Sequence, residues 1–216
     1  MIVVATNNGM AFLPKLLDSF SKYGTAGHKV CIVDTGSTDP VYIDYINSLD
    51  KDAYIIMKTP YRGYDTGAYI WAYRNTNESE YLFMHDSMEV VDSGWVEEFS
   101  THGDVCAYSF FKLNYFDFQF NHFKDVGIYN PNTTVGMAGP IFYIKRPILD
   151  VLDAQFNLDK VIPDCKWNQS GMELGWYMMF ATMNIHVHNL YYLTGDHSCS
   201  VNEFNPKLQK RAALRN

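Results

Sequence analysis

The segment IVDTGSTDP, residues 32–40, decides the fold of this chain. An apolar, β-branched run ends on Asp34, and a small polar turn then leads to a helix start at Pro40. The opening segment IVVATNN, residues 2–8, has the same strand-like character. Ligands of α/β proteins bind beyond the carboxyl ends of parallel strands, so Asp34 is placed to contact one. The same pattern also describes a strand–turn–helix in which Asp34 only caps the turn.

Strand-like and helical patterns alternate through the first half of the chain. Apolar residues recur at helical spacing or in short buried runs. Helices are expected at residues 13–20, 42–49 and 67–74, and strands at 53–57 and 81–84. Strict alternation of strand and helix predicts the α/β class, with a mostly parallel central sheet flanked by helices.

The second half of the chain is less regular. Strands are expected at residues 105–111, 141–144 and 185–188, and a helix at 171–183. The stretch between the first two of these strands is rich in Phe, Tyr, Asn and Gly, which favours a long functional loop or a small subdomain.

Composition and charge exclude several classes of protein. A chain of 216 residues with 47% hydrophobic residues fits one α/β domain. Its net charge of -7 argues against nucleic acid as a partner, because phosphate binding needs a basic field. The four cysteines are scattered without metal-type spacing, and no signal peptide or membrane-spanning segment is evident. We therefore expect a soluble, cytoplasmic protein with reduced thiols.

Three motifs in chain order resemble family 2-like and rhamnan-synthesis-like glycosyltransferases of the A-type fold. The first is the segment at residues 32–40 together with RGYDTG at residues 62–67. In that family the strand-end Asp, here Asp34, accepts a hydrogen bond from uracil. Arg62 would face the nucleotide, and Asp65 would accept hydrogen bonds from donor-sugar hydroxyls. Asp65 as a helix N-cap, with Arg62 in a surface ion pair, is the structural alternative.

The resemblance also implies further donor-site residues and a metal. Thr6, Asn7 and Asn8, at the end of the first strand, would contact the nucleotide. The second motif is His85-Asp86-Ser87. It falls where the family carries its D-x-D motif, so His85 and Asp86 would face the donor. Carboxylate oxygens at a strand end suit Mn²⁺ or Mg²⁺ bound to a diphosphate.

The metal ligands implied by the resemblance are Asp86, Ser87 and a late histidine, His197. Ser87 stands where a second acid is common in the family. His85 is an alternative nitrogen ligand, which would favour Mn²⁺.

The third motif, SGMELGW at residues 170–176, resembles the E-D-x-E-L-G stretch of family 2. There a carboxylate near the start of a late helix acts as general base in an inverting transfer. Gly171 replaces the usual Asp, so Glu173 is the predicted base and Asp164 the second choice. Glu173 as an acidic first-turn residue of the helix is the structural alternative.

Two tryptophans flank this motif. Trp167 and Trp176 would stack on the acceptor sugar, or else belong to the core.

The resemblance implies a metal-dependent, inverting transfer from a UDP-sugar to a glycan or protein-linked glycan acceptor. Residues 1–104 would form the nucleotide-sugar half and 105–216 the acceptor half of one domain, which could be a module of a longer protein. The chain is similar to the small glycosyltransferase domains of chlorella viruses. A non-catalytic sugar- or nucleotide-binding domain would explain Ser87 and Gly171, and a nucleotidyltransferase is a third class. The sugar, the acceptor, the linkage and the oligomeric state stay open.

Overall fold

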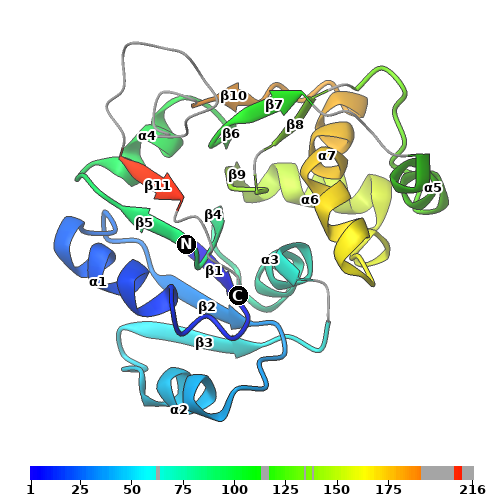
Figure 1. Ribbon diagram of the computed structural model, residues 1–216. Coiled ribbons are helices and arrows are strands. Elements are labelled where there is room, and N and C mark those ends of the chain that lie inside the picture. Colours follow the sequence, from blue (N-terminus) through cyan, green and yellow to red (C-terminus); the bar gives the residue numbers. More distant parts are fainter. Residues whose placement is uncertain (62–63, 113–116, 134, 138, 191–206, 211–216) are drawn as a thin grey trace.

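Seven strands form the central sheet of the computed structural model, in the order β10-β6-β9-β4-β1-β2-β3 (Figure 1). The structure describes residues 1–61, 64–112, 117–133, 135–137, 139–190 and 207–210. The strands of this sheet are β1 Ile2–Thr6, β2 Val30–Asp34, β3 Tyr54–Lys58, β4 Glu80–His85, β6 Val105–Ala107, β9 Phe142–Lys145 and β10 His188–Asn189. Two small sheets flank it, pairing β5 Met88–Val90 with β11 Leu208–Lys210, and β7 Phe110–Lys112 with β8 Val135–Met137.

The predicted parallel arrangement is confirmed for β1, β2, β3 and β4, the first four strands along the chain. β1 lies between β2 and β4 and runs parallel to both, and β2 runs parallel to β3. β9 is antiparallel to its two neighbours, β4 and β6. The sheet is therefore mostly parallel, with one reversed strand in its second half.

Helices cover both faces of the sheet (Figure 1). They are α1 Leu13–Tyr23, α2 Pro40–Ser48, α3 Tyr64–Asn75, α4 Trp95–Thr101, α5 Asp117–Asp125, α6 Arg146–Phe156 and α7 Lys166–Thr182, with a short 3₁₀ helix η1 at Leu158–Val161. The predicted helix at 171–183 begins five residues earlier, and the predicted strand at 105–111 is two short strands, β6 and β7. The helices α4, α5 and α6 were not predicted.

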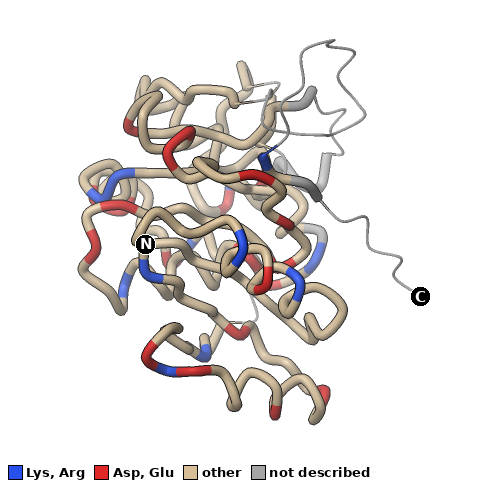
Figure 2. The backbone as a smooth tube through the Cα atoms, turned by 90° about the vertical axis from the view of Figure 1, so that its left-hand side faces the viewer, with Lys and Arg blue, Asp and Glu red and all other residues tan. Residues whose placement is uncertain are grey.

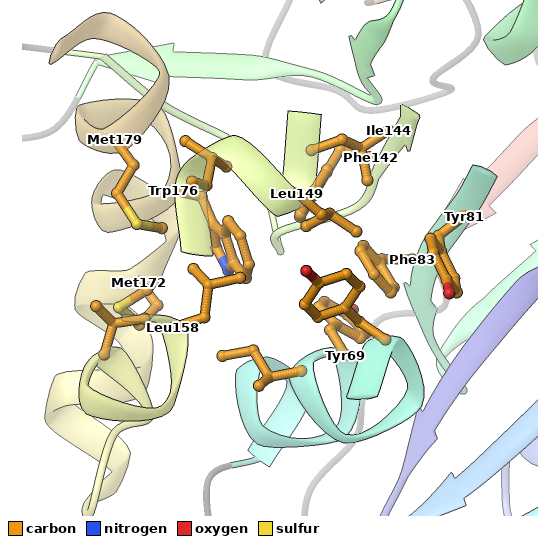
Figure 3. Packing of buried hydrophobic residues seen from close by; sticks show 14 of the residues in the cluster. Tyr69, Tyr81, Phe83, Phe142, Ile144, Leu149, Leu158, Met172, Trp176 and Met179 are labelled. Atoms are coloured by element: carbon orange, nitrogen blue, oxygen red, sulfur yellow. The ribbon is translucent and has the colours of Figure 1, made fainter. Parts of the chain in front are cut away.

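The core has two parts, one on each face of the sheet. Along β1, Val3 and Ala5 face one apolar cluster, and Ile2 and Val4 face the other. Because both faces are buried, the parallel strands read as continuous apolar runs rather than as an alternating pattern. Figure 3 shows the first cluster, in which side chains of α3, β4, β9 and α7 pack together.

Charged positions are distributed over the described backbone rather than gathered on one face. Acidic and basic segments are interspersed along the tube in Figure 2. Within the part of the chain that the structure describes, no helix combines the length and apolar character needed to cross a bilayer.

An ion-pair network joins α3 to α6 and η1. Both terminal nitrogens of Arg74 contact the carboxylate of Asp153, at 2.5 and 2.6 Å, and one of them also contacts Asp159 at 3.0 Å. The hydrogen bonds from Arg74 lower the pKa of Asp153, whose side chain is 22% exposed. A bidentate contact of this kind fixes the relative position of two helices that are distant in the sequence.

We expect Asp153→Asn to lower the free energy of unfolding by about 1 kcal/mol at neutral pH. The folded-state pKa of Asp153 lies below its usual value of 3.8. Its contribution is therefore present above that value and is lost as the pH falls through the folded-state pKa. Urea unfolding of the wild type and the variant at pH 7 and near pH 3 measures this difference.

Asp104→Asn is the matched control, because Asp104 pairs with Lys145 at the surface with its side chain 60% exposed. It should change stability by only a few tenths of a kcal/mol. If the two variants lost equal free energy of unfolding at pH 7, the pair of Arg74 and Asp153 would stabilise the protein no more than an exposed ion pair does.

Candidate functional site

The carboxyl ends of β1, β2 and β4 meet at one edge of the sheet and bring three predicted residues together. Thr6 on β1 is the register partner of Asp34 on β2. The amide of Asp86, directly after β4, donates to the carbonyl of Ala5 at 3.1 Å. Because β1 pairs with both neighbours, Thr6, Asp34 and Asp86 lie at or directly after the ends of adjacent strands. This is the reversal point at which α/β sheets bind ligands.

Asp34 is almost fully buried at this edge. It is 4% exposed, and its Oδ1 accepts a hydrogen bond from the amide of Ser37 at 2.9 Å. One carboxylate oxygen therefore holds the turn, as in the capping alternative. Asp34 also lines a pocket with Lys58 and with apolar residues of α2 and β3. Both a structural and a ligand-facing role are compatible with this position.

Asn7 and Asn8 tie the loop after β1 to the loop after β2. Asn8 Oδ1 accepts hydrogen bonds from the amides of Thr38 and Asp39, each at 2.9 Å, and the amide of Asn8 donates to Ser37 Oγ at 2.8 Å. Asn8 has a φ of 48°, a left-handed conformation that Asn tolerates better than most residues. Both asparagines are exposed, and they order the loops beside the site.

Asp86 is held from inside the protein. Its Oδ2 accepts a hydrogen bond from Thr6 Oγ1 at 2.7 Å. Gly9 lies directly against this pair: a Cβ atom there would overlap Asp86 Oδ2 and lie 2.7 Å from Thr6 Oγ1. The close approach of the backbone at Gly9 therefore requires glycine, a role that sequence reasoning missed.

His85 and Ser87 contact each other. The two side chains are joined by a 2.7 Å hydrogen bond between Ser87 Oγ and His85 Nδ1, and His85 is only 9% exposed. Among the described residues, no three or more His, Cys, Asp or Glu side chains are arranged to hold a metal ion. The predicted ligand His197 and the predicted nucleotide contact Arg62 lie outside the described residues.

Asp65 is the second residue of α3, so it is an acidic first-turn residue and not the N-cap. One turn later, the hydroxyl of Tyr69 is buried and has no hydrogen-bond partner among the residues that the structure describes. Burial raises the pKa of Tyr69, and the carboxylates of Asp65 and Asp86 add to this effect. Asp65 and Asp86 therefore both lie within electrostatic reach of one buried hydroxyl.

Glu173 lies in the interior of α7, because this helix begins at Lys166. The alternative of a first-turn acid that suits the helix dipole is therefore wrong. Glu173 is half-buried, and its Oε1 accepts a hydrogen bond from the amide of Gly139 at 3.1 Å.

Asp164 precedes α7 and is exposed. A hydrogen bond from Asn168, 2.9 Å from Asp164 Oδ1, lowers the pKa of Asp164. A lowered pKa makes a carboxylate a weaker base, so Glu173 stays the preferred candidate.

The interpretation of Trp176 as an acceptor platform is corrected by its burial. Trp176 is 0% exposed, its ring lies 5.0 Å from that of Phe142, and its Nε1 donates to Thr66 Oγ1 at 3.4 Å. It belongs to the core, as Figure 3 shows, and offers no face to a sugar. Trp167 lies in the first turn of α7, and its side chain is outside the described residues.

Comparison with known proteins identifies the fold. No protein-family model and no curated protein sequence matches the chain. Among solved structures, Staphylococcus aureus TarS matches with a TM-score of 0.51 at 16% identity, over 87% of this chain and 34% of that chain. TarS 1-349 in complex with UDP matches with a TM-score of 0.48 at 17% identity, over 87% of this chain and 57% of that chain. Its complex with UDP-GlcNAc matches with a TM-score of 0.47 at 16% identity, over 70% of this chain and 46% of that chain.

The match with a TM-score of 0.51 supports the predicted α/β fold with a mostly parallel central sheet flanked by helices. The chain spans between 34% and 57% of the length of the TarS chains that it resembles. The similarity to chlorella-virus domains is not supported by these matches and stays a prediction from the sequence.

We expect Gly9→Ala to destabilise the protein by about 1–3 kcal/mol, because the added methyl group must displace Asp86 or the loop after β1. Asp86→Ala removes the nearer of the two atoms with which the methyl group collides. The double variant should therefore lose clearly less stability than the sum of the two single losses, as measured by urea unfolding. Losses that simply add would show that Gly9 and Asp86 do not contact each other.

Proposed function

We propose that this chain is the catalytic domain of a glycosyltransferase that uses a UDP-sugar donor. The observation that carries the proposal is the convergence of Thr6, Asp34 and Asp86 at the carboxyl ends of β1, β2 and β4. Likeness to TarS, which was solved with UDP and with UDP-GlcNAc, makes UDP-sugars the donors to test first. The acceptor is a glycan or a protein-linked glycan.

The nucleotide would lie across the ends of β1 and β2. The Ser37 amide binds Asp34 Oδ1 and so orders the turn. We assign the hydrogen bond from the uracil N–H to the other oxygen of this carboxylate. A buried carboxylate in a pocket with apolar walls discriminates well, because a base without that donor leaves it unpaired. Arg62 would contact the nucleotide, and Asp65, in the first turn of α3, the hydroxyls of the sugar.

A divalent cation fits this site only if the donor shares it. The described residues offer one carboxylate at the end of β4, that of Asp86, and Ser87 is the next residue in the sequence. Mg²⁺ and Mn²⁺ are commonly held by one or two carboxylates together with substrate phosphates, so Asp86 and the diphosphate form a sufficient set. The cation would neutralise the charge of the leaving diphosphate. Ser87 Oγ and His85 Nδ1 are hydrogen-bonded to each other, so Asp86 is the ligand that we assign at this strand end.

Glu173 would be the base that takes the acceptor proton in an inverting transfer. The amide of Gly139 fixes one oxygen of its carboxylate, and the interior of α7 is a rigid platform. A catalytic group on a regular helix is positioned more tightly than one on a loop. A base in this role removes the proton from the acceptor hydroxyl while that oxygen attacks the anomeric carbon from the side opposite the diphosphate.

A non-catalytic UDP-sugar-binding domain is the second candidate. Ser87 and Gly171 stand where the resembling family carries acids, so two groups expected of an enzyme are absent from this sequence. Release of UDP from a UDP-sugar separates the two functions, because a binding domain leaves the donor intact.

We expect UDP to bind more tightly with Mn²⁺ or Mg²⁺ than in EDTA, as measured by isothermal calorimetry. Asp86→Asn should lose most of this metal-dependent gain, since an amide oxygen is a much poorer cation ligand than a carboxylate. Asp92→Asn, a change of charge in the loop that follows β5, is the control and should keep the gain. Equal UDP affinity of the wild type in Mn²⁺ and in EDTA would exclude the shared cation.

We expect Glu173→Gln to slow UDP release from its UDP-sugar by about 10²–10⁴-fold, with donor affinity unchanged. Gln retains an oxygen that accepts the hydrogen bond from Gly139, so the fold should be preserved. A panel of UDP-sugars assayed for UDP release identifies the donor and measures the rate. A wild-type rate in this variant moves the assignment to Asp164, and retention of the anomeric configuration excludes the inverting mechanism.

A further inference from the structure

The hydroxyl of Tyr42 reaches from α2 to the candidate site through the interior of the protein. Tyr42 is 0% exposed, and its hydroxyl is hydrogen-bonded to Thr6 Oγ1. Thr6 Oγ1 is bonded in turn to Asp86 Oδ2 at 2.7 Å. Three residues from α2, β1 and the end of β4 thus form one continuous chain of hydrogen bonds.

Proton counting sets the direction of this chain. An ionised carboxylate only accepts hydrogen bonds, so Thr6 donates its single hydroxyl proton to Asp86. Thr6 then has only lone pairs to offer, and Tyr42 is the donor in the other bond. Burial raises the pKa of the Tyr42 hydroxyl, which keeps its proton at neutral pH. The chain therefore runs from Tyr42 through Thr6 to Asp86.

The surroundings leave the carboxylate little freedom on this side. Gly9 packs against both Asp86 Oδ2 and Thr6 Oγ1, with no room for a Cβ atom. Thr6 is itself 3% exposed, and β1 is paired on both edges. One oxygen of the Asp86 carboxylate is thus held by a chain of groups that are themselves at most 3% exposed.

We propose that Tyr42 is a positioning residue that acts through Thr6 to hold the Asp86 carboxylate in the orientation that binds the cation shared with the donor diphosphate. This inference rests on the proposed function. Groups that hydrogen-bond to a metal-binding side chain change metal affinity by about 10–100-fold, because they orient the ligand before the metal arrives. Without the chain, the carboxylate lacks one of the bonds that orient it before the cation binds, and the added ordering cost reduces affinity.

The test compares UDP affinity with and without metal in a matched pair of variants. Tyr42→Phe removes the buried hydroxyl and keeps the ring. Tyr45→Phe removes a hydroxyl from the next turn of the same helix, where the ring stacks on Tyr42. Calorimetric titrations with UDP are made in Mn²⁺ and in EDTA. Tyr42→Phe should lose about 10-fold of UDP affinity in Mn²⁺ and none in EDTA, and Tyr45→Phe should match the wild type in both.

Substitutions of Thr6 provide a second pair of variants that tests the same chain of hydrogen bonds. Thr6→Ser retains the hydroxyl and should keep the metal-dependent affinity, whereas Thr6→Val has nearly the same shape without a hydroxyl and should lose it. Adding Tyr42→Phe to Thr6→Val should cost no further affinity, because the chain is already broken. This pair tests the inference even if Tyr42→Phe does not fold.

Each contrary outcome has a separate meaning. Wild-type behaviour of Tyr42→Phe in Mn²⁺, or an equal loss in Mn²⁺ and EDTA, overturns the positioning role and leaves the proposed function standing. A wild-type protein that binds UDP equally in Mn²⁺ and EDTA overturns the shared cation and the inference with it. A protein that binds no UDP overturns the proposed function.

Discussion

The structure depends on the position of β1, which is paired in parallel with β2 on one edge and with β4 on the other. This double pairing buries β1 on every side and makes its carboxyl end the point at which the crossover connections diverge. Thr6 and the start of the following loop consequently lie between two other strand ends. The residues after all three strands face the same region because parallel strands in register end together.

The antiparallel strand β9 extends the same sheet in the opposite sense. It pairs with β4 and β6, so the second half of the chain continues the sheet of the first instead of forming a separate core. Packing of α7 against α3 reinforces the connection, with Trp176 donating to Thr66 and Gln169 accepting from the Thr66 amide. The candidate base Glu173 is on the helix that makes these contacts, so its position is linked to that of α3.

The site combines rigid backbone with a buried chain of hydroxyl groups. Asn8 and Ser37 order the loops from the solvent side, and Tyr42 and Thr6 act from the core side. Asp86 is half-buried, and the hydrogen bond from Thr6 offsets part of the cost of removing its carboxylate from water.

The sequence alone determined the α/β class, the strand–helix alternation to Asp86, and the placement of Asp34 and Asp86 at strand ends. These features follow from local patterns and from a general rule of parallel sheets. Only the tertiary structure decided that Trp176 is core, that β9 is antiparallel and that Tyr42 reaches Asp86 through Thr6. The reason is physical. The spacing of apolar residues in the sequence shows which side chains are buried. The hydrogen-bond partner of a buried polar atom, however, depends on packing between elements that lie far apart in the chain.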